Sequence, residues 1–191
     1  MVIDILVDKW EVKATDIIHL NKFYIGLHDY LWREEYSEAK DAGFPEMYYW
    51  ETRTQKGGNE IWVWWRPFRK IRSNSFYERF FVIDLHAVGM RKVDVIKANK
   101  KWTVDTGKVE VLVKVKLRLD PKNEWQNNWF LKSFLNVFYK RIYRKNIMMH
   151  KDELLKDSYK MQEFCKRLMD LNTFATPVKP YDATLGFIPN F

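Results

Sequence analysis

The segment from Val109 to Leu119 alternates strictly between two kinds of position. Its odd-numbered positions hold only valine and leucine, and its even-numbered positions hold Glu110, Leu112, Lys114, Lys116 and Arg118. A period of two over this length is typical of an antiparallel strand with one face on a core. The segment therefore predicts a sheet whose buried face is aliphatic and whose other face carries positive charge at one edge.

Further strands are predicted upstream of this segment. Apolar alternation and β-branched or aromatic content favour strands at residues 1–13, 47–53, 61–66, 76–86, 93–96 and 102–104. We expect a hairpin turn at 56–59, a break at Gly89 and a second turn at 105–108, because glycine tolerates the backbone angles of turns. Both faces of 61–66 are apolar, so we expect both to be covered.

Helices are predicted on either side of these strands. Thr15 or Asp16 is expected to cap a helix whose apolar residues recur at three- and four-residue steps up to Leu31. The helical period returns at Asn123, is expected to break at 146–150, and then resumes. The proline-containing residues 173–191 predict an extended tail, which leaves residues 1–172 as a single domain.

This order of elements predicts an α+β protein. We expect an antiparallel curved sheet with an N-terminal helix and long C-terminal helices, which resembles the helix-grip (START-like) fold. The segments 57–66, 80–86 and 129–132 also resemble a group of uncharacterised archaeal proteins. That resemblance implies an archaeal cytoplasm but no activity, and folds of the helix-grip type host many functions.

Composition narrows the class of protein. Of the 191 residues 47% are hydrophobic, which excludes a disordered chain, and 17% are aromatic. The single cysteine excludes an intramolecular disulfide. Asp4 and Asp8 lie in an N-terminal stretch without the basic region of a signal peptide, and no apolar run reaches the roughly 20 residues of a membrane span. We therefore expect a cytoplasmic protein.

Catalytic and metal-binding motifs are weak. Cys165 is interpreted as a small buried hydrophobe. Asp84 and His86 share one strand face, and His150 and Glu153 share one helix face, but a metal site needs three or four ligands. Because no nucleophile–base pair or phosphate-binding loop is recognisable, an enzyme is the least favoured class, and no cofactor or metal is expected.

Clusters of basic residues are the strongest indication of function in this sequence. The net charge of the chain is +8, and its isoelectric point is near 9.4. They favour a non-catalytic binding or scaffold protein that engages a polyanion, with RNA or DNA ahead of an anionic membrane surface. Its predicted contacts are Arg66, Arg69, Lys70, Arg72, Lys132, Lys140, Arg141 and Arg144. The alternative interpretation of these cations is an ordinary solvated surface.

Two further functions stay open at this point. A helix-grip sheet can enclose a cavity beside its C-terminal helix, and an apolar ligand there would contact Trp62, Trp64, Trp129 and Phe134. The competing interpretation of these residues is a filled core. The many aromatic residues and the exposed strand edges also favour a homo-oligomeric structural protein.

Overall fold

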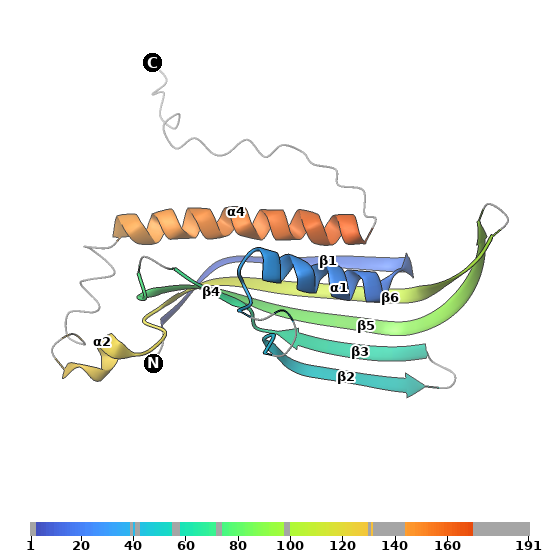
Figure 1. The fold of residues 1–191 in the computed structure, drawn as a ribbon, viewed down its shortest axis with the longest axis horizontal. Helices are drawn as coiled ribbons and strands as arrows, with labels where there is room; N and C mark the ends of the chain where they lie inside the picture. The colour runs from blue at the N-terminus through green and yellow to red at the C-terminus, as the bar shows by residue number, and fades with distance from the viewer. Residues whose placement is uncertain are drawn as a thin grey trace, which may run out of the picture.

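A six-stranded antiparallel sheet forms the centre of the protein in the computed structural model (Figure 1), which describes residues 3–38, 40, 43–54, 58–71, 74–97, 100–129, 131 and 144–169. Its strands are β1 (Ile3–Ile18), β2 (Glu46–Thr54), β3 (Gly58–Trp65), β4 (Phe68–Lys70), β5 (Tyr77–Lys97) and β6 (Lys100–Leu119). The strands pair in the order β1-β6-β5-β3-β2, and β4 pairs with β5. The first strand thus lies beside the last, and β1 and β2 form the two edges.

Three helices are described: α1 (Leu20–Arg33), α2 (Glu124–Asn127) and α4 (Arg144–Leu168). Helices α1 and α4 lie on the same side of the sheet (Figure 1). We call this side of the sheet the inner face and the opposite side the outer face. The α+β class and the antiparallel sheet with an N-terminal and a C-terminal helix are therefore confirmed.

The alternation in β6 places its aliphatic side chains on the inner face. Each odd-numbered residue from Val109 to Leu119 is fully buried. Burying side chains of this size stabilises the fold by roughly 1.5–3 kcal/mol each. Phe23, Leu27 and Leu31 of α1 and Leu154, Met161 and Cys165 of α4 cover these positions as part of one core cluster.

Strand β1 is longer than predicted, so the expected helix cap at Thr15 or Asp16 is wrong. Both residues pair with β6, in a ladder that continues to Ile18 opposite Asp105. Helix α1 begins only at Leu20, and its N-cap residue His19 makes no capping side-chain hydrogen bond. Cross-strand pairing along β6 thus overrides the local capping preference of Thr15 and Asp16.

The predicted break at Gly89 and turn at 105–108 are also wrong. Strand β5 continues through Gly89, which has φ 66°, with a register shift against β6 between Val88 and Arg91. Residues 105–108 pair with β1 on one side and β5 on the other, apart from this shift. A β-bulge adds a residue and bends a strand without ending it. Beyond it, the described ends of β5 and β6 curve towards the side of the helices (Figure 1).

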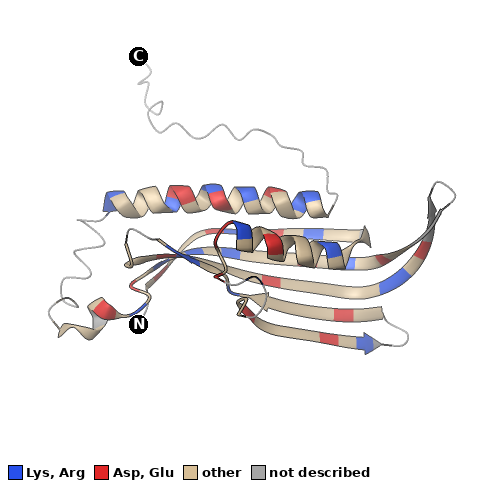
Figure 2. Cartoon of the chain, viewed as in Figure 1, with Lys and Arg blue, Asp and Glu red and all other residues tan. Residues whose placement is uncertain are grey.

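Helix α4 is continuous where a break at 146–150 was predicted. Ile147 and His150 are buried and lie on the same face as Leu154, Ser158 and Met161. The stretch contains no glycine or proline, so the helical backbone continues even where the apolar pattern weakens. Charged residues occupy much of its remaining surface (Figure 2).

Trp64 is not covered as predicted, whereas Trp62 is half-buried. Val63 and Trp65 face the core with 2% exposure, whereas Trp64 is 40% exposed on the outer face.

The expected basic loop after Pro67 includes the short strand β4. Within the predicted helix from Asn123, the structure shows the short helix α2 and a helical backbone at residue 131. Residues 132–143 and the predicted tail 173–191 lie outside the described residues.

Candidate functional site

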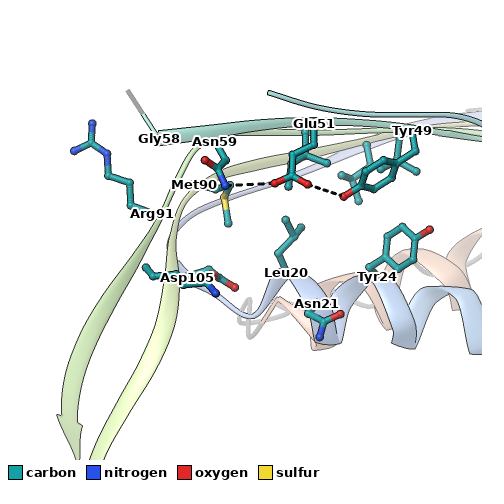
Figure 3. Close-up of a pocket in the computed structure, with 14 residues that line it drawn as sticks. Leu20, Asn21, Tyr24, Tyr49, Glu51, Gly58, Asn59, Met90, Arg91 and Asp105 are labelled. Carbon is teal, nitrogen blue, oxygen red and sulfur yellow. Dashed lines mark hydrogen bonds between the residues drawn. The ribbon is translucent and has the colours of Figure 1, made fainter. Parts of the chain in front are cut away.

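A cleft of about 690 Å³ lies on the inner face between α1 and the sheet. Figure 3 shows how its walls meet. Helix α1, the strands β2, β3 and β5, and one residue of β6 supply the lining: Leu20, Asn21, Tyr24, Tyr49, Glu51, Gly58, Asn59, Ile61, Val63, Leu85, Met90, Arg91, Lys92 and Asp105. We call this space the cleft. Its volume falls in the range of about 300–1,000 Å³ that is typical of small-molecule sites.

The floor of the cleft is apolar because it consists of inner-face positions of two paired strands. Ile61 and Val63 come from β3, and Leu85 comes from β5, where it pairs directly with Val63. Val63 and Leu85 are 2% and 3% exposed. Alternation in β3 therefore directs isoleucine and valine into the cleft while its tryptophans Trp62 and Trp64 lie on the other face.

The bulge in β5 shapes one end of the cleft. Gly58 has φ 87°, and a side chain there would lie 2.7 Å from the backbone carbonyl carbon of Gly89. The two glycines thus let β3 and β5 approach closely where β5 bends. Met90 follows the bend and is 6% exposed, and Arg91 and Lys92 line the cleft beyond it.

Hydrogen bonds hold the polar groups of the walls. The Tyr24 hydroxyl donates to Glu46 Oε2 at 2.7 Å, and the Tyr49 hydroxyl points to Glu51 Oε2 at 3.4 Å. Burial and the neighbouring carboxylates raise the pKa of both phenols. Both tyrosines therefore remain neutral at physiological pH and present hydroxyl groups and ring faces rather than charge.

Charges at the cleft are balanced in sign. Glu51 and Asp105 are acidic, and Arg91 and Lys92 are basic. Glu51 also accepts hydrogen bonds from Arg53 Nε at 3.1 Å and from Asn59 Nδ2 at 3.4 Å. Because neither sign dominates, the cleft is not built around a single strongly charged ligand group.

The described residues show neither a metal-ligand cluster nor an exposed cysteine. They contain no cluster of three His, Cys, Asp or Glu side chains that could hold a metal ion. Cys165 is fully buried, and burial raises the pKa of its thiol to about 12, so it is a protonated core residue as predicted. The cleft itself contains no histidine or cysteine.

Asp84 and His86 lie on the outer face, away from the cleft. Asp84 Oδ1 pairs with Arg66 Nη2 at 2.8 Å, and His86 Nε2 lies 2.8 Å from Glu60 Oε1. The His86 ring stacks on Trp62 with 3.6 Å between ring centroids. These contacts agree with the interpretation of the pair as members of a hydrogen-bonded polar patch.

Three of the predicted polyanion contacts are already paired with other groups of the chain. Arg66 is paired with Asp84, Arg69 Nη1 donates to the Glu34 carbonyl at 3.2 Å, and Lys70 lies 2.5 Å from Glu38. Arg144 is exposed at the start of α4. The remaining predicted contacts lie outside the described residues: Arg72, Lys132, Lys140 and Arg141.

The cavity residues chosen from the sequence are not those of the cleft. Trp62 and Trp64 line a second, smaller pocket of about 400 Å³ on the outer face, and Trp129 is 84% exposed. Phe134 lies outside the described residues. The cleft lies beside the N-terminal helix, not the C-terminal helix, and its floor uses the small aliphatic residues between the tryptophans. The alternation of side chains in 61–66 already separates Trp62 and Trp64 on one face from Ile61 and Val63 on the other.

Comparisons with known proteins assign no family. No family model matches the chain, and no curated protein matches it. A solved structure from Staphylococcus aureus, a protein of unknown function called SA2116, is 11% identical and aligns over 85% of this chain and 94% of its own. Its TM-score of 0.15 is too low to support an inference about fold or function. Among the described helices, none combines the length and the apolar character that crossing a membrane requires.

Proposed function

We propose that this protein is a non-catalytic binder of a small, mainly apolar molecule, which it holds in the cleft between α1 and the sheet. The observation that supports this function is the cleft of about 690 Å³ with an apolar floor and hydrogen-bonding groups on its walls. A concave site of this size with a few converging polar groups is the usual form of a small-molecule site. The proposal retains the apolar-ligand function suggested by the sequence and changes its location.

The lining suggests how such a ligand would lie. Apolar side chains of Leu20, Ile61 and Leu85 would contact its body. Polar and charged side chains gather towards the bent end of β5, where Arg91 and Asp105 lie on one side of the view in Figure 3. We infer a ligand with one polar end directed to that bend, carrying both hydrogen-bond donors and acceptors.

A substitution at the mouth of the cleft tests the site directly. Asn21 and Lys22 are adjacent, exposed residues of α1, but only Asn21 lines the cleft. We expect Asn21→Trp to weaken binding of the amphipathic dye anilinonaphthalene sulfonate by about tenfold or more, because one added indole occupies ligand volume. Lys22→Trp adds the same side chain outside the cleft and should bind the dye like the wild type.

Native mass spectrometry of untagged protein from its own host supplies a second readout. Bound mass of a few hundred daltons that is reduced in Asn21→Trp supports the proposal. Equal dye binding by the wild type and both variants, together with no bound small molecule, would refute it.

Polyanion binding is the second candidate function, and one observation favours a location for it. Lys9 and Lys114 lie directly opposite each other in the β1–β6 ladder. Like charges at such positions destabilise a sheet, so a bound phosphate group would relieve their repulsion. This location on the outer face differs from the contacts predicted from the sequence.

Fluorescence anisotropy with a single-stranded RNA oligonucleotide tests this candidate. The logarithm of the affinity should fall linearly with the logarithm of salt concentration, because bound phosphates release counterions. We expect the double variant Lys9→Gln, Lys114→Gln to bind more weakly at every salt concentration. Lys22→Gln together with Lys151→Gln removes the same charge from the helices and serves as the control. RNA binding that is absent at low salt would exclude the candidate.

A further inference from the structure

The two edges of the sheet differ in how they are protected from pairing with another strand. An edge strand presents unpaired backbone N–H and C=O groups, and proteins block such edges with bulges, charges, proline or a covering element. Strand β1 has a bulge between Leu6 and Asp8. It also carries alternating charges, and α4 packs against it through a hydrogen bond from Trp10 Nε1 to Ser158 Oγ at 2.9 Å.

Strand β2 has much weaker protection. It pairs with β3 on one side, and within the described residues no strand pairs with its other side. It carries the charged residues Glu46, Glu51 and Arg53 but no lysine or proline, and its one register irregularity lies at its first residues. Four consecutive large side chains are exposed: Met47 70%, Tyr48 40%, Tyr49 51% and Trp50 42%. In an antiparallel ladder about every second residue of β2 directs its backbone groups away from β3 and towards solvent.

We propose that β2 is a dimer interface, at which the β2 strands of two copies of this chain pair in antiparallel fashion to form one continuous sheet. A two-fold axis passes through Trp50, which is the midpoint of Glu46–Thr54 and therefore gives the largest overlap of the two strands. This inference does not rest on the proposed ligand-binding function, although Tyr49 and Glu51 of the interface also line the cleft.

Charge and side-chain complementarity favour a second copy in this register. Trp50 lies opposite Trp50 of the second copy, Tyr49 opposite Glu51, and Tyr48 opposite Thr52. No like charges face each other, and the Tyr49 hydroxyl can donate to the opposing carboxylate. A register moved by one residue, centred on Glu51, would place two carboxylates directly opposite each other, which is destabilising. The paired tryptophans supply the aromatic contact that is enriched in the centre of interfaces.

Sedimentation velocity over concentrations from about 1 to about 100 µM tests the oligomeric state. We expect the wild type to sediment at twice the monomer mass at the higher concentrations. Trp50→Lys should be monomeric throughout, because two lysines would oppose each other at the axis. Trp32→Lys is the matched control, since Trp32 is also 42% exposed but lies on α1; it should dimerise normally.

Cysteine cross-linking with diamide as the oxidant tests the register. Trp50→Cys should give a covalent dimer, because directly opposed Cα atoms about 4.5–5.5 Å apart are within disulfide range. Tyr48→Cys should not, because each new cysteine would lie opposite Thr52 instead. Cys165 is fully buried and contributes no background. A wild type that is monomeric at all concentrations, or equal cross-linking of the two variants, would overturn the proposal.

Discussion

Two regions of the inner face rest on the same sheet and differ in what fills the space above it. Near the start of β5, α4 covers the sheet and a network of charged side chains occupies the contact. Near the bulge of β5, α1 leaves the cleft open. The comparison shows that one curved sheet can combine a tightly fixed helix with a binding space, provided that different helices cover the two regions.

The charged network under α4 centres on Arg79 of β5. The guanidinium pairs with Asp157 at 3.0 Å and with Glu153, and its side chain is only 7% exposed. Asp157 also accepts a hydrogen bond from the Tyr36 hydroxyl at 2.8 Å, and burial is the main reason that the pKa of Tyr36 lies well above its usual value. Such a network fixes the position of α4 because each buried charge needs its partner.

The cleft is organised in the opposite way. Its hydrogen bonds link groups within the walls, such as Tyr24 to Glu46 and Asn59 to Glu51. They hold the walls in place and leave the apolar floor uncovered. A ligand can therefore reach the apolar floor of the cleft, whereas α4 and its charged network already fill the other region.

Removal of the central cation of the network should have the largest effect on stability. We expect Arg79→Met to lower the free energy of unfolding by about 3 kcal/mol, since Asp157, only 15% exposed, loses its nearest cation and keeps only Arg69 at 3.8 Å. Urea denaturation measures the loss. Arg53→Met is the control: its side chain is 81% exposed, so its loss should stay within about 0.5 kcal/mol. Similar losses in both variants would show that the Arg79 network does not fix α4.

A valine-to-alanine substitution should cost more stability in the filled core than in the cleft. Val113 of β6 is 0% exposed and Val63 of β3 is 2% exposed, so both are buried. Only Val63 lines the cleft. We expect Val113→Ala to cost about 2 kcal/mol and Val63→Ala about half as much, because Val63 already lacks contacts on one side. Thermal and urea unfolding of the pair measure the difference. Equal losses would indicate that the cleft is closed in solution.

The smallest expected effect is a dependence of stability on pH in the region under α4. His150 packs on Tyr77 and lies near Glu153 and Arg79. Burial lowers its pKa, opposed by Glu153 and assisted by Arg79. The unfolded chain therefore binds a proton first as the pH falls below about 6.5. The contribution of His150 to the free energy of unfolding is therefore fully present above that pH. It declines at lower pH until His150 of the folded protein also binds a proton.

The variant His150→Gln isolates this contribution. Its unfolding free energy should decline less than that of the wild type between pH 7 and pH 5 in parallel urea titrations, because glutamine binds no proton. His28→Gln serves as the control, since His28 belongs to α1, where its ring packs on Phe44 at 3.9 Å, and not to the network under α4. A steeper decline in His150→Gln than in the wild type would contradict the assigned sign.

Parts of this arrangement were accessible from the sequence because they depend on local periodicity. The alternation of Val109–Leu119 identified strand β6 and its buried face, and the apolar steps of α1 and α4 identified the helices. The order of elements was enough to predict the α+β class. Cys165 was correctly interpreted as a core residue on its apolar surroundings.

Other features depend on contacts between distant segments. Gly89 looks like a strand break in isolation, but the ladders with β6 and β3 carry β5 through it as a bulge. Residues 105–108 look like a turn, but they are held between β1 and β5. The basic side chains of Arg66 and Lys70 looked available for a polyanion, but Asp84 and Glu38 lie beside them in the folded chain.

The order of residues along the chain is enough to assign the apolar faces of the strands and helices, since side-chain periodicity follows directly from backbone geometry. The bend of the sheet, the helix that leaves a space above it and the pairing of charges are set by contacts in the folded protein. These properties arise from close approaches such as that between Gly58 and Gly89, whose residues are far apart in the chain, and no local pattern encodes that proximity.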